Sequence, residues 1–353
     1  MKKPLLFLPG PMQVPDHILA AASRPMFNHR SSEMDAFLSK LENGCRRLCG
    51  TAGDVIFLAS SGTGAMESAI VNLTSPGEEI IVIVGGTFAQ RWTEIGKAYG
   101  LTPHTVNVDW RKGPEVSEVE AALRQFPAAR TVFMTWSESS TGVLNELEAI
   151  GRLIRSQGKY LVVDAVSGLA VSPMKMDDWC VDAVISGSQK GLMLPAGIGL
   201  VAVGSRAWEL EKQAKSPRFY WEWSRYKGTA PFTPALTLLF QLDAALDYIA
   251  ELGHERFFGR RAEVASHVRG LVETAGFELY AVKPGDGVTA VLAPAPFDIP
   301  AFKNSLEKDY GIQIAGGLGP LATTIFRIGH VGHVSSDELE YFTNSFKAVL
   351  SNS

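Results

Sequence analysis

The sequence predicts an α/β protein with a mostly parallel sheet covered by helices. Between residues 55 and 204, short runs rich in β-branched residues alternate with helical patterns, which is the rhythm of parallel strands joined by crossover helices. The runs VIFLA, IIVIV and YLVVD are continuously apolar, as expected of strands buried on both faces. A chain of 353 residues is long enough for a large domain and a smaller one.

The expected elements follow one another at short intervals. Strands are expected at residues 55–59, 80–85, 131–136, 160–164, 181–186 and 199–203, and crossover helices at 65–73, 88–98, 116–126 and 146–157. A long helix at 235–252 and an Arg-rich helix after it are expected to lead into a small α+β domain, with strands near 288–292 and 324–328 and helices near 299–310 and 337–350. We therefore divide the chain into an N-terminal segment (1–20) that lines the site, a large domain (21–250) and a small domain (251–353).

Composition narrows the classes of partner. Charged residues make up 20% of the chain and the formal net charge is -4, which indicates neither nucleic acid nor an anionic membrane surface. No apolar stretch approaches the roughly 18 residues that a membrane helix needs. Cys45, Cys49 and Cys180 make a poor disulfide framework and fit a reducing compartment, so we expect a cytoplasmic protein. No His or Cys cluster completes a metal site beside them, and we expect no bound metal.

Two ionisable residues stand at the ends of expected strands. Lys190 follows the strand at 181–186 within the small-residue segment SGSQKG, at the carboxyl edge where open α/β sheets bind ligands. Asp164 ends the strand YLVVD, where a carboxylate is costly unless it is paired. Taken alone, a lysine in such a loop is ordinarily just a solvated charge, and the aspartate could equally cap the next turn.

A small-residue turn and an aromatic residue belong to the same expected edge. The turn SSGTGAME at residues 60–67 joins a strand to a helix, so its N–H groups and the helix dipole favour an anion such as phosphate. Phe88 opens the helix after the strand at 80–85 and is placed to cover a flat ring. An ordinary helix cap and ordinary core packing are the alternatives. Pyridoxal phosphate chemistry requires a lysine to hold the aldehyde, an acid to keep the pyridine nitrogen protonated, an anion site for the phosphate and an aromatic side chain against the ring. Each requirement has a candidate among these residues.

These residues together resemble the class V, fold type I aminotransferases, most closely the branch of alanine-glyoxylate, serine-glyoxylate and serine-pyruvate aminotransferases. The resemblance covers nearly the whole chain and is carried by FLPGPMQVP (7–15), NHRSSEM (28–34), SSGTGAMES (60–68), ESSTGVL (138–144), VVDAVSGL (162–169), GSQKGLMLPAG (187–197), and GGLG and FRIGHVG near the C-terminus. It implies a large domain with a mostly parallel seven-stranded sheet between helices and a small α+β C-terminal domain.

The resemblance also implies roles for particular residues. Lys190 would hold pyridoxal 5'-phosphate as a Schiff base, and Asp164 would pair with the pyridine nitrogen. The other implied cofactor contacts are Thr63, Gly64, Ala65 and Gln189 at the phosphate, Phe88 and Val166 on the two ring faces, and Ser139 beside the ring oxygen. Arg327 would bind the substrate carboxylate, and the backbone at Gly10 would line the substrate pocket.

A homodimer with shared active sites is implied as well. Counting back from the helix after Pro234 makes Thr233 the threonine that completes the neighbouring subunit's phosphate site. The aromatic residue that accompanies it in the family has no clear counterpart, because Thr229 and Ala230 stand at its position and Tyr226 lies upstream. The segment 217–231 is rich in aromatic residues, which are enriched at interfaces.

The implied reaction moves an amino group from a small amino acid, serine or alanine, to glyoxylate or pyruvate by a ping-pong mechanism. A lyase such as a cysteine desulfurase on the same scaffold is the first alternative. It would need a mobile cysteine in the C-terminal part and usually a histidine over the ring, whereas the last cysteine here is Cys180 and the stacking position holds Phe88. A nucleotide-binding α/β protein that uses the glycine-rich turn alone is the second alternative.

Overall fold

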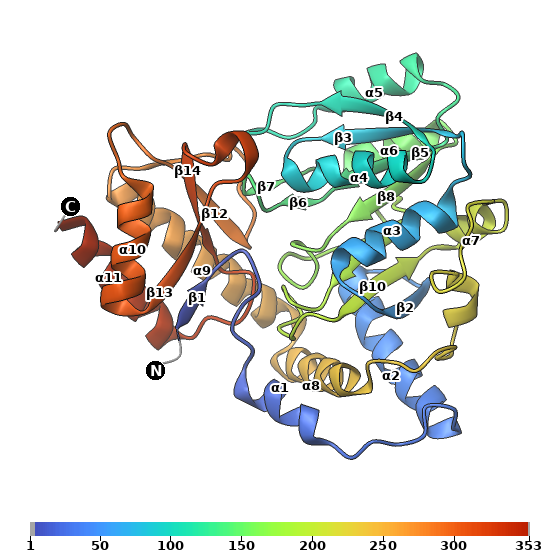
Figure 1. Cartoon of the computed structure of the whole chain (residues 1–353), viewed down its shortest axis with the longest axis horizontal. Coiled ribbons are helices and arrows are strands. Elements are labelled where there is room, and N and C mark those ends of the chain that lie inside the picture. The colour runs from blue at the N-terminus through green and yellow to red at the C-terminus, as the bar shows by residue number, and fades with distance from the viewer. Residues whose placement is uncertain (1–3, 352–353) are drawn as a thin grey trace.

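The computed structural model describes residues 4–351 and divides into a large and a small α/β part (Figure 1). The strands are β1 (Leu5–Phe7), β2 (Asp54–Ala59), β3 (Glu79–Val84), β4 (Thr102–Asn107), β5 (Thr131–Thr135), β6 (Ser137–Glu138), β7 (Val143–Leu144), β8 (Tyr160–Asp164), β9 (Ala183–Gly187), β10 (Ile198–Val203), β11 (Glu278–Leu279), β12 (Val288–Leu292), β13 (Ile312–Gly316) and β14 (Ile325–Gly329). The helices are α1 (Asp16–Ala20), α2 (Ser32–Cys49), α3 (Gly62–Leu73), α4 (Thr87–Ala98), α5 (Val116–Gln125), α6 (Glu148–Ser156), α7 (Ser205–Glu211), α8 (Leu236–Leu252), α9 (His254–Thr274), α10 (Ile299–Tyr310) and α11 (Ser336–Ser351), with short 3-10 turns η1 (Ala21–Ser23), η2 (Trp223–Tyr226) and η3 (Gly319–Leu321).

The large part is built on a seven-stranded sheet in the order β2-β10-β9-β8-β5-β3-β4. Its strands are parallel except that β10 runs antiparallel to both of its neighbours. The predicted mostly parallel seven-stranded sheet is therefore confirmed. Strand β4 has no counterpart among the predicted strands, because it lies at the sheet edge and its sequence TPHTVN is largely polar and partly exposed.

Apolar cores on both faces of this sheet explain the continuously apolar strands. Along β3, Ile81 and Ile83 pack into one core, which also contains residues of α2, α6 and α8. The alternate residues Ile80 and Val82 pack into the other core with α3, α4 and α7. Because successive side chains point to opposite faces, a strand covered on both sides has to be apolar at every position.

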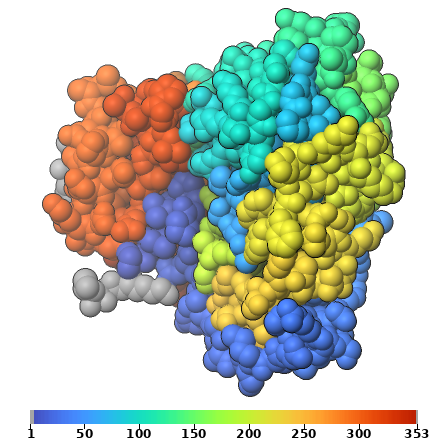
Figure 2. Space-filling model, turned by 45° about the vertical axis from the view of Figure 1, so that its right-hand side comes forward, coloured from blue at the N-terminus to red at the C-terminus, as the bar shows by residue number. Residues whose placement is uncertain are grey.

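The small part is a five-stranded sheet in the order β1-β13-β14-β12-β11, covered by α9, α10 and α11 (Figure 1). Strand β1 comes from the N-terminus and pairs in parallel with β13, with Leu5 opposite Ile312. Phe7 of β1 stacks on Phe342 of α11 with 4.1 Å between the ring centroids. The N-terminal chain thus joins the small sheet and then, as Figure 2 shows, lies between the two parts.

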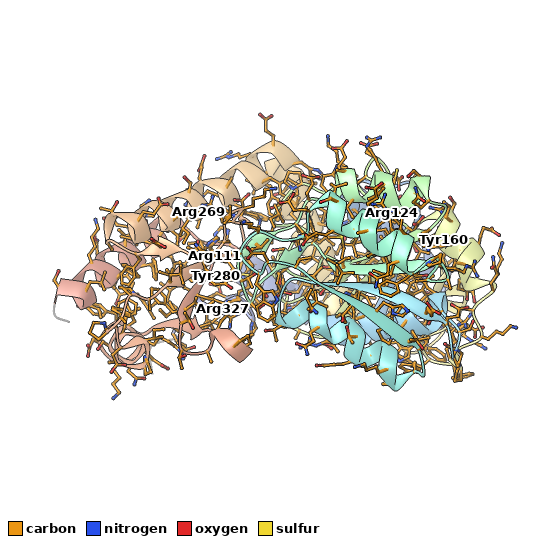
Figure 3. The ribbon with its side chains drawn as sticks, turned by 90° about the horizontal axis from the view of Figure 1, so that it is seen from above. Arg111, Arg124, Tyr160, Arg269, Tyr280 and Arg327 are labelled. Carbon is orange, nitrogen blue, oxygen red and sulfur yellow. The ribbon has the colours of Figure 1, made fainter. Side chains whose placement is uncertain are left out.

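Side chains of the large part contact the small part directly. Arg111, ahead of α5, donates from Nε to the Tyr280 carbonyl at 2.9 Å, and its guanidinium lies 5.7 Å from the Tyr280 ring centroid. Figure 3 shows this pair where the two parts face each other. The turn at Gly253 separates α8, which packs on α2, from α9, which packs on β12. We keep the division at residues 20 and 250 as a proposal.

Across residues 4–351 we find no helix that combines the length and the apolarity needed to cross a membrane.

Candidate active site

The candidate site lies where several strands of the large sheet end. The loops after β2, β3, β5, β8 and β9 meet at one edge because these strands are parallel. They surround a cavity of about 350 Å³. Seven of the residues singled out in the sequence line it: Gly10, Thr63, Phe88, Asp164, Val166, Gln189 and Lys190.

Lys190 brings a buried amine into this cavity. The residue follows β9 after a short turn, its side chain is 8% exposed, and Nζ donates to the Pro9 carbonyl. Burial disfavours the charged form and lowers the pKa of Lys190 to about 8. An amine with this pKa loses its proton near neutral pH far more readily than an exposed lysine does, and the neutral form is the nucleophile.

Gly10 explains how the N-terminal chain approaches the lysine so closely. A Cβ atom at this position would lie 2.7 Å from Cδ and 2.9 Å from Nζ of Lys190. The residue also has φ of +125°, a conformation that favours glycine. Contact between Lys190 and the preceding carbonyl of Pro9 therefore depends on the absence of a side chain at residue 10.

Asp164 occupies the end of β8, almost fully buried. Its Oδ1 accepts a hydrogen bond from the Val166 N–H at 2.8 Å. Burial raises the pKa of Asp164 to about 6, and the nearby Lys190 charge acts in the opposite direction. A buried carboxylate of this kind is well suited to a cationic or protonated partner that enters the cavity.

The turn between β2 and α3 offers N–H groups to an anion. Ser61 caps α3, its Oγ accepting from the Gly64 N–H at 3.4 Å, and its carbonyl accepts from the Ala65 N–H at 3.1 Å. The N–H groups of Gly62 and Thr63 stand at the first two helical positions, where no preceding turn accepts them. The phosphate contacts expected at Thr63, Gly64 and Ala65 stay a prediction; in the structure the Gly64 and Ala65 N–H groups are engaged by Ser61, whereas those of Gly62 and Thr63 lie at the open start of the helix.

Glu138 fixes the start of α4, where Phe88 lies. Its carboxylate accepts from the N–H groups of Phe88 at 3.1 Å and Ala89 at 2.9 Å, and from Ser140 Oγ at 2.6 Å. Glu138 is 1% exposed, and a negative charge at a helix N-terminus is favourable. Sequence analysis did not single out this residue, although it opens the quoted segment ESSTGVL.

Arg327 reaches the site from the small part. Its Nε donates to the Gly316 carbonyl and its Nη1 to the Ser139 carbonyl, both at 2.8 Å. Burial lowers the pKa of Arg327 to about 10. Figure 3 shows Arg327 at the side of the small part that faces the large one. Neither Arg327 nor Ser139 lines the cavity itself, whereas Ser137 does.

Arg91 also lines the cavity, and the sequence analysis did not identify this residue. It lies one turn after Phe88 on α4, with its guanidinium carbon 5.1 Å from the Phe88 ring centroid. Its Nη1 donates to Thr63 Oγ1 at 2.9 Å. Its spacing of three residues from Phe88 puts both residues on one helix face, and this is the signal that could have identified it.

Thr233 lies apart from this cavity within its own chain. It is exposed and lines a separate small cavity together with Tyr220 and Phe232. Among the aromatic residues of the preceding loop, Trp223 is fully buried in its own subunit, while Phe219 is 66% exposed. The loop therefore serves both the core and the surface.

No three His, Cys, Asp or Glu side chains are grouped as a metal site would require within residues 4–351. Cys45 and Cys49 are buried residues of α2, and burial raises the pKa of Cys49 to about 12.

Comparisons with known proteins agree with this geometry. The profile of the family described as "Aminotransferase class-V" matches residues 15–327. The chain is 37% identical to a protein named soluble hydrogenase, small subunit, from Synechococcus sp. (strain PCC 6716), over 99% of this chain and 93% of that protein. It is 32% identical to the serine–glyoxylate aminotransferase of Arabidopsis thaliana, over 95% and 87%.

Among solved structures, the alanine–glyoxylate aminotransferase from Nostoc sp. superposes with a TM-score of 0.94 at 26% identity, covering 99% of this chain and 96% of that one. With the family profile spanning most of the chain and the fold shared throughout, the chain belongs to the class V aminotransferases, fold type I enzymes that depend on pyridoxal phosphate.

Proposed function

We propose that this aminotransferase moves an amino group from serine or alanine to glyoxylate or pyruvate, with Lys190 as its catalytic lysine. The observation that carries the proposal is the buried Lys190 amine, with its pKa near 8, in one cavity with the buried carboxylate of Asp164. The names of the relatives from Arabidopsis and Nostoc support glyoxylate as an acceptor.

The residues around the cavity fit pyridoxal phosphate. The Gly62 and Thr63 N–H groups would donate to the phosphate at the start of α3, and Gln189, which lines the same cavity, has an amide N–H2 group that can donate to it as well. Phe88 and Val166 line the cavity from different elements and would contact the two ring faces. When bound, the cofactor supplies an aldehyde for the amino group and a ring that withdraws electrons.

In the proposed reaction, Lys190, Asp164 and Arg327 each have a separate role. Lys190 Nζ takes the α-proton from the substrate and returns it later, because an amine with a pKa near 8 exchanges protons easily near neutral pH. Asp164 holds a proton on the ring nitrogen by its negative charge. Arg327 binds the substrate carboxylate, in exchange for part of its present bonding to Ser139. Because donor and acceptor use the same cavity in turn, ping-pong kinetics are expected.

The lyase alternative lacks support at the site. Cys180 lies in the loop that precedes β9, at the opposite edge of the sheet from the cavity, which follows the ends of the parallel strands. It is therefore badly placed to attack a substrate beside Lys190.

We also propose a cytoplasmic homodimer with shared sites. The exposed position of Thr233 leaves its hydroxyl available to a second copy, and the 66% exposed Phe219 ring lies in the same loop region. Cys45, Cys49 and Cys180 are free thiols, which suits a reducing compartment.

Lys190→Ala tests the function. We expect it to abolish transamination while the protein still folds and still binds pyridoxal phosphate, since the phosphate and ring contacts remain. A panel of amino donors against glyoxylate and pyruvate measures turnover, and circular dichroism checks the fold.

The matched control is Lys212→Ala, because Lys212, the C-cap of α7, has a 66% exposed side chain and pairs with Glu209 of that helix. Turnover of Lys190→Ala close to that of the wild type would refute the assigned role. If no donor in the panel supports turnover by the wild type, the proposed substrates are wrong.

A further inference from the structure

Arg91 has no acidic partner, although it lines a cavity that also contains Asp164. Among residues 4–351 no carboxylate lies within ion-pair distance of its guanidinium. Its guanidinium donates a hydrogen bond to Thr63 Oγ1 and lies over the Phe88 ring. Glu138, the nearby buried acid on the α4 side, is engaged by the N–H groups of Phe88 and Ala89.

The position of Arg91 identifies the kind of anion that it would meet. Its Nη1 lies 2.9 Å from Oγ1 of Thr63, and Thr63 is one of the two residues whose N–H groups are unengaged at the start of α3. The guanidinium is therefore beside the anion-binding turn. Arg327 approaches from the other domain and bonds to Ser139, so a substrate carboxylate already has a separate cation.

We propose that Arg91 is a binding residue for the cofactor phosphate, adding a cation to the anion site at Gly62 and Thr63. This inference rests on the proposed function. A phosphate monoester carries close to two negative charges at neutral pH and accepts several hydrogen bonds, which suits a planar guanidinium next to helical N–H groups. The remaining nitrogens of Arg91 donate to phosphate oxygens while Nη1 keeps its bond to Thr63.

The same contact links the phosphate site to the ring site. The Arg91 guanidinium lies over the Phe88 ring, and Phe88 lines the cavity where the pyridine ring belongs. Arg91 therefore contacts both the phosphate turn, through Thr63, and the candidate ring-stacking residue Phe88.

The experiment separates phosphate binding from ring stacking by comparing two ligands on cofactor-free protein. The dissociation constants of pyridoxal phosphate and of pyridoxal, which lacks the phosphate, are measured for the wild type, Arg91→Met and Arg91→Lys. We expect Arg91→Met to weaken pyridoxal phosphate binding by about tenfold to a hundredfold, because a hydrogen bond to a charged group is lost. Pyridoxal binding changes little, and Arg91→Lys lies between because it keeps the charge.

Arg124→Met is the matched control. Arg124 is on α5 with a 68% exposed side chain and an ion pair to Glu120, and Figure 3 shows it on the large part, away from Arg327. It should bind both ligands as the wild type does. Inorganic phosphate should compete with pyridoxal phosphate for the wild type at lower concentration than for Arg91→Met.

Three results would overturn the inference. Equal weakening of pyridoxal and pyridoxal phosphate would make Arg91 a support for Phe88 only. Unchanged affinity for both ligands, with a raised KM for the amino donor at saturating cofactor, would make it a substrate residue. If the wild type itself fails to bind pyridoxal phosphate, the proposed function falls and takes this inference with it. Arg91→Lys keeps the test valid if Arg91→Met does not fold.

Discussion

Lys190 illustrates at the residue scale how a reactive group works against the stability of the fold. Its amine is buried, and burial lowers its pKa from 10.5 to about 8. Below pH 8 the amine is protonated in both the folded and the unfolded chain, so the cost of burying the charge is fully present. Between pH 8 and pH 10.5 the folded chain loses this proton first, so the free energy of unfolding rises with pH.

We therefore expect Lys190→Met to stabilise the cofactor-free protein at pH 7, by about 2 kcal/mol if the whole shift counts and the lost bond to Pro9 is subtracted. The advantage should shrink as the pH rises toward 10.5. Urea unfolding of both proteins at pH 7 and pH 10 measures the two differences.

Lys212→Met serves as the exposed control and should differ little from the wild type at either pH. A stability difference between Lys190→Met and the wild type that stays constant across this range would show that the amine is not the cause.

At the scale of the element, α4 is held by an acid that belongs to another segment. Glu138 accepts hydrogen bonds from the N–H groups of Phe88 and Ala89, and a Cβ at Gly86 would lie 2.3 Å from Glu138 Cγ. The close approach explains why glycine precedes this helix. Because Phe88 and Arg91 both project from α4, the position of this carboxylate decides where two cavity residues lie.

Glu138→Ala should lower the free energy of unfolding by about 2 to 4 kcal/mol, because several buried donors lose their acceptor. Glu138→Gln keeps an acceptor oxygen and should cost about 1 kcal/mol, mostly from the lost charge at the helix N-terminus. Thermal unfolding of the cofactor-free proteins compares the two variants.

Glu120→Ala on α5 controls for loss of an exposed glutamate, since its side chain is 45% exposed. Equal stability of Glu138→Ala and Glu120→Ala would contradict the role given to Glu138. Retention of normal cofactor affinity by a destabilised Glu138→Ala would limit that role to folding.

At the scale of the whole molecule, the proposed dimer places Thr233 of one subunit at the site of the other. Lys190→Ala and Thr233→Glu should each be inactive. Mixed, dissociated and refolded together in equal amounts, they should regain about a quarter of the wild-type sites, because half of the dimers are mixed and each mixed dimer has one intact site. Activity assays before and after mixing provide the measurement.

Refolding each variant alone is the control and should restore no activity. If mixed dimers form, as shown by two different tags, and remain inactive, the shared site is refuted. Sedimentation of the wild type as a monomer at assay concentration would refute the dimer itself.

Features that depend on neighbouring residues in the chain could be predicted from the sequence. Continuous apolar runs marked the strands that are covered on both faces, and Asp164 and Lys190 were found because polar residues interrupt those runs at strand ends. The edge strand β4 was missed for the opposite reason, since a half-exposed strand needs no such run. The same local logic indicated the anion turn before α3, but not which of its N–H groups remain available.

The arrangement that makes these parts a site comes from long-range packing between the two parts of the molecule. The pairing of β1 with β13 brings Pro9 and Gly10 to Lys190 across 181 positions of chain, and no local pattern encodes that distance. Arg91 and Glu138 read in the sequence as ordinary charged residues. Their importance arises from what surrounds them: a cavity without an acidic partner for the arginine, and a buried helix N-terminus that holds the glutamate. Charge and burial depend on the neighbours that folding supplies, which is why composition and spacing predicted the chemistry of the site but not all of its residues.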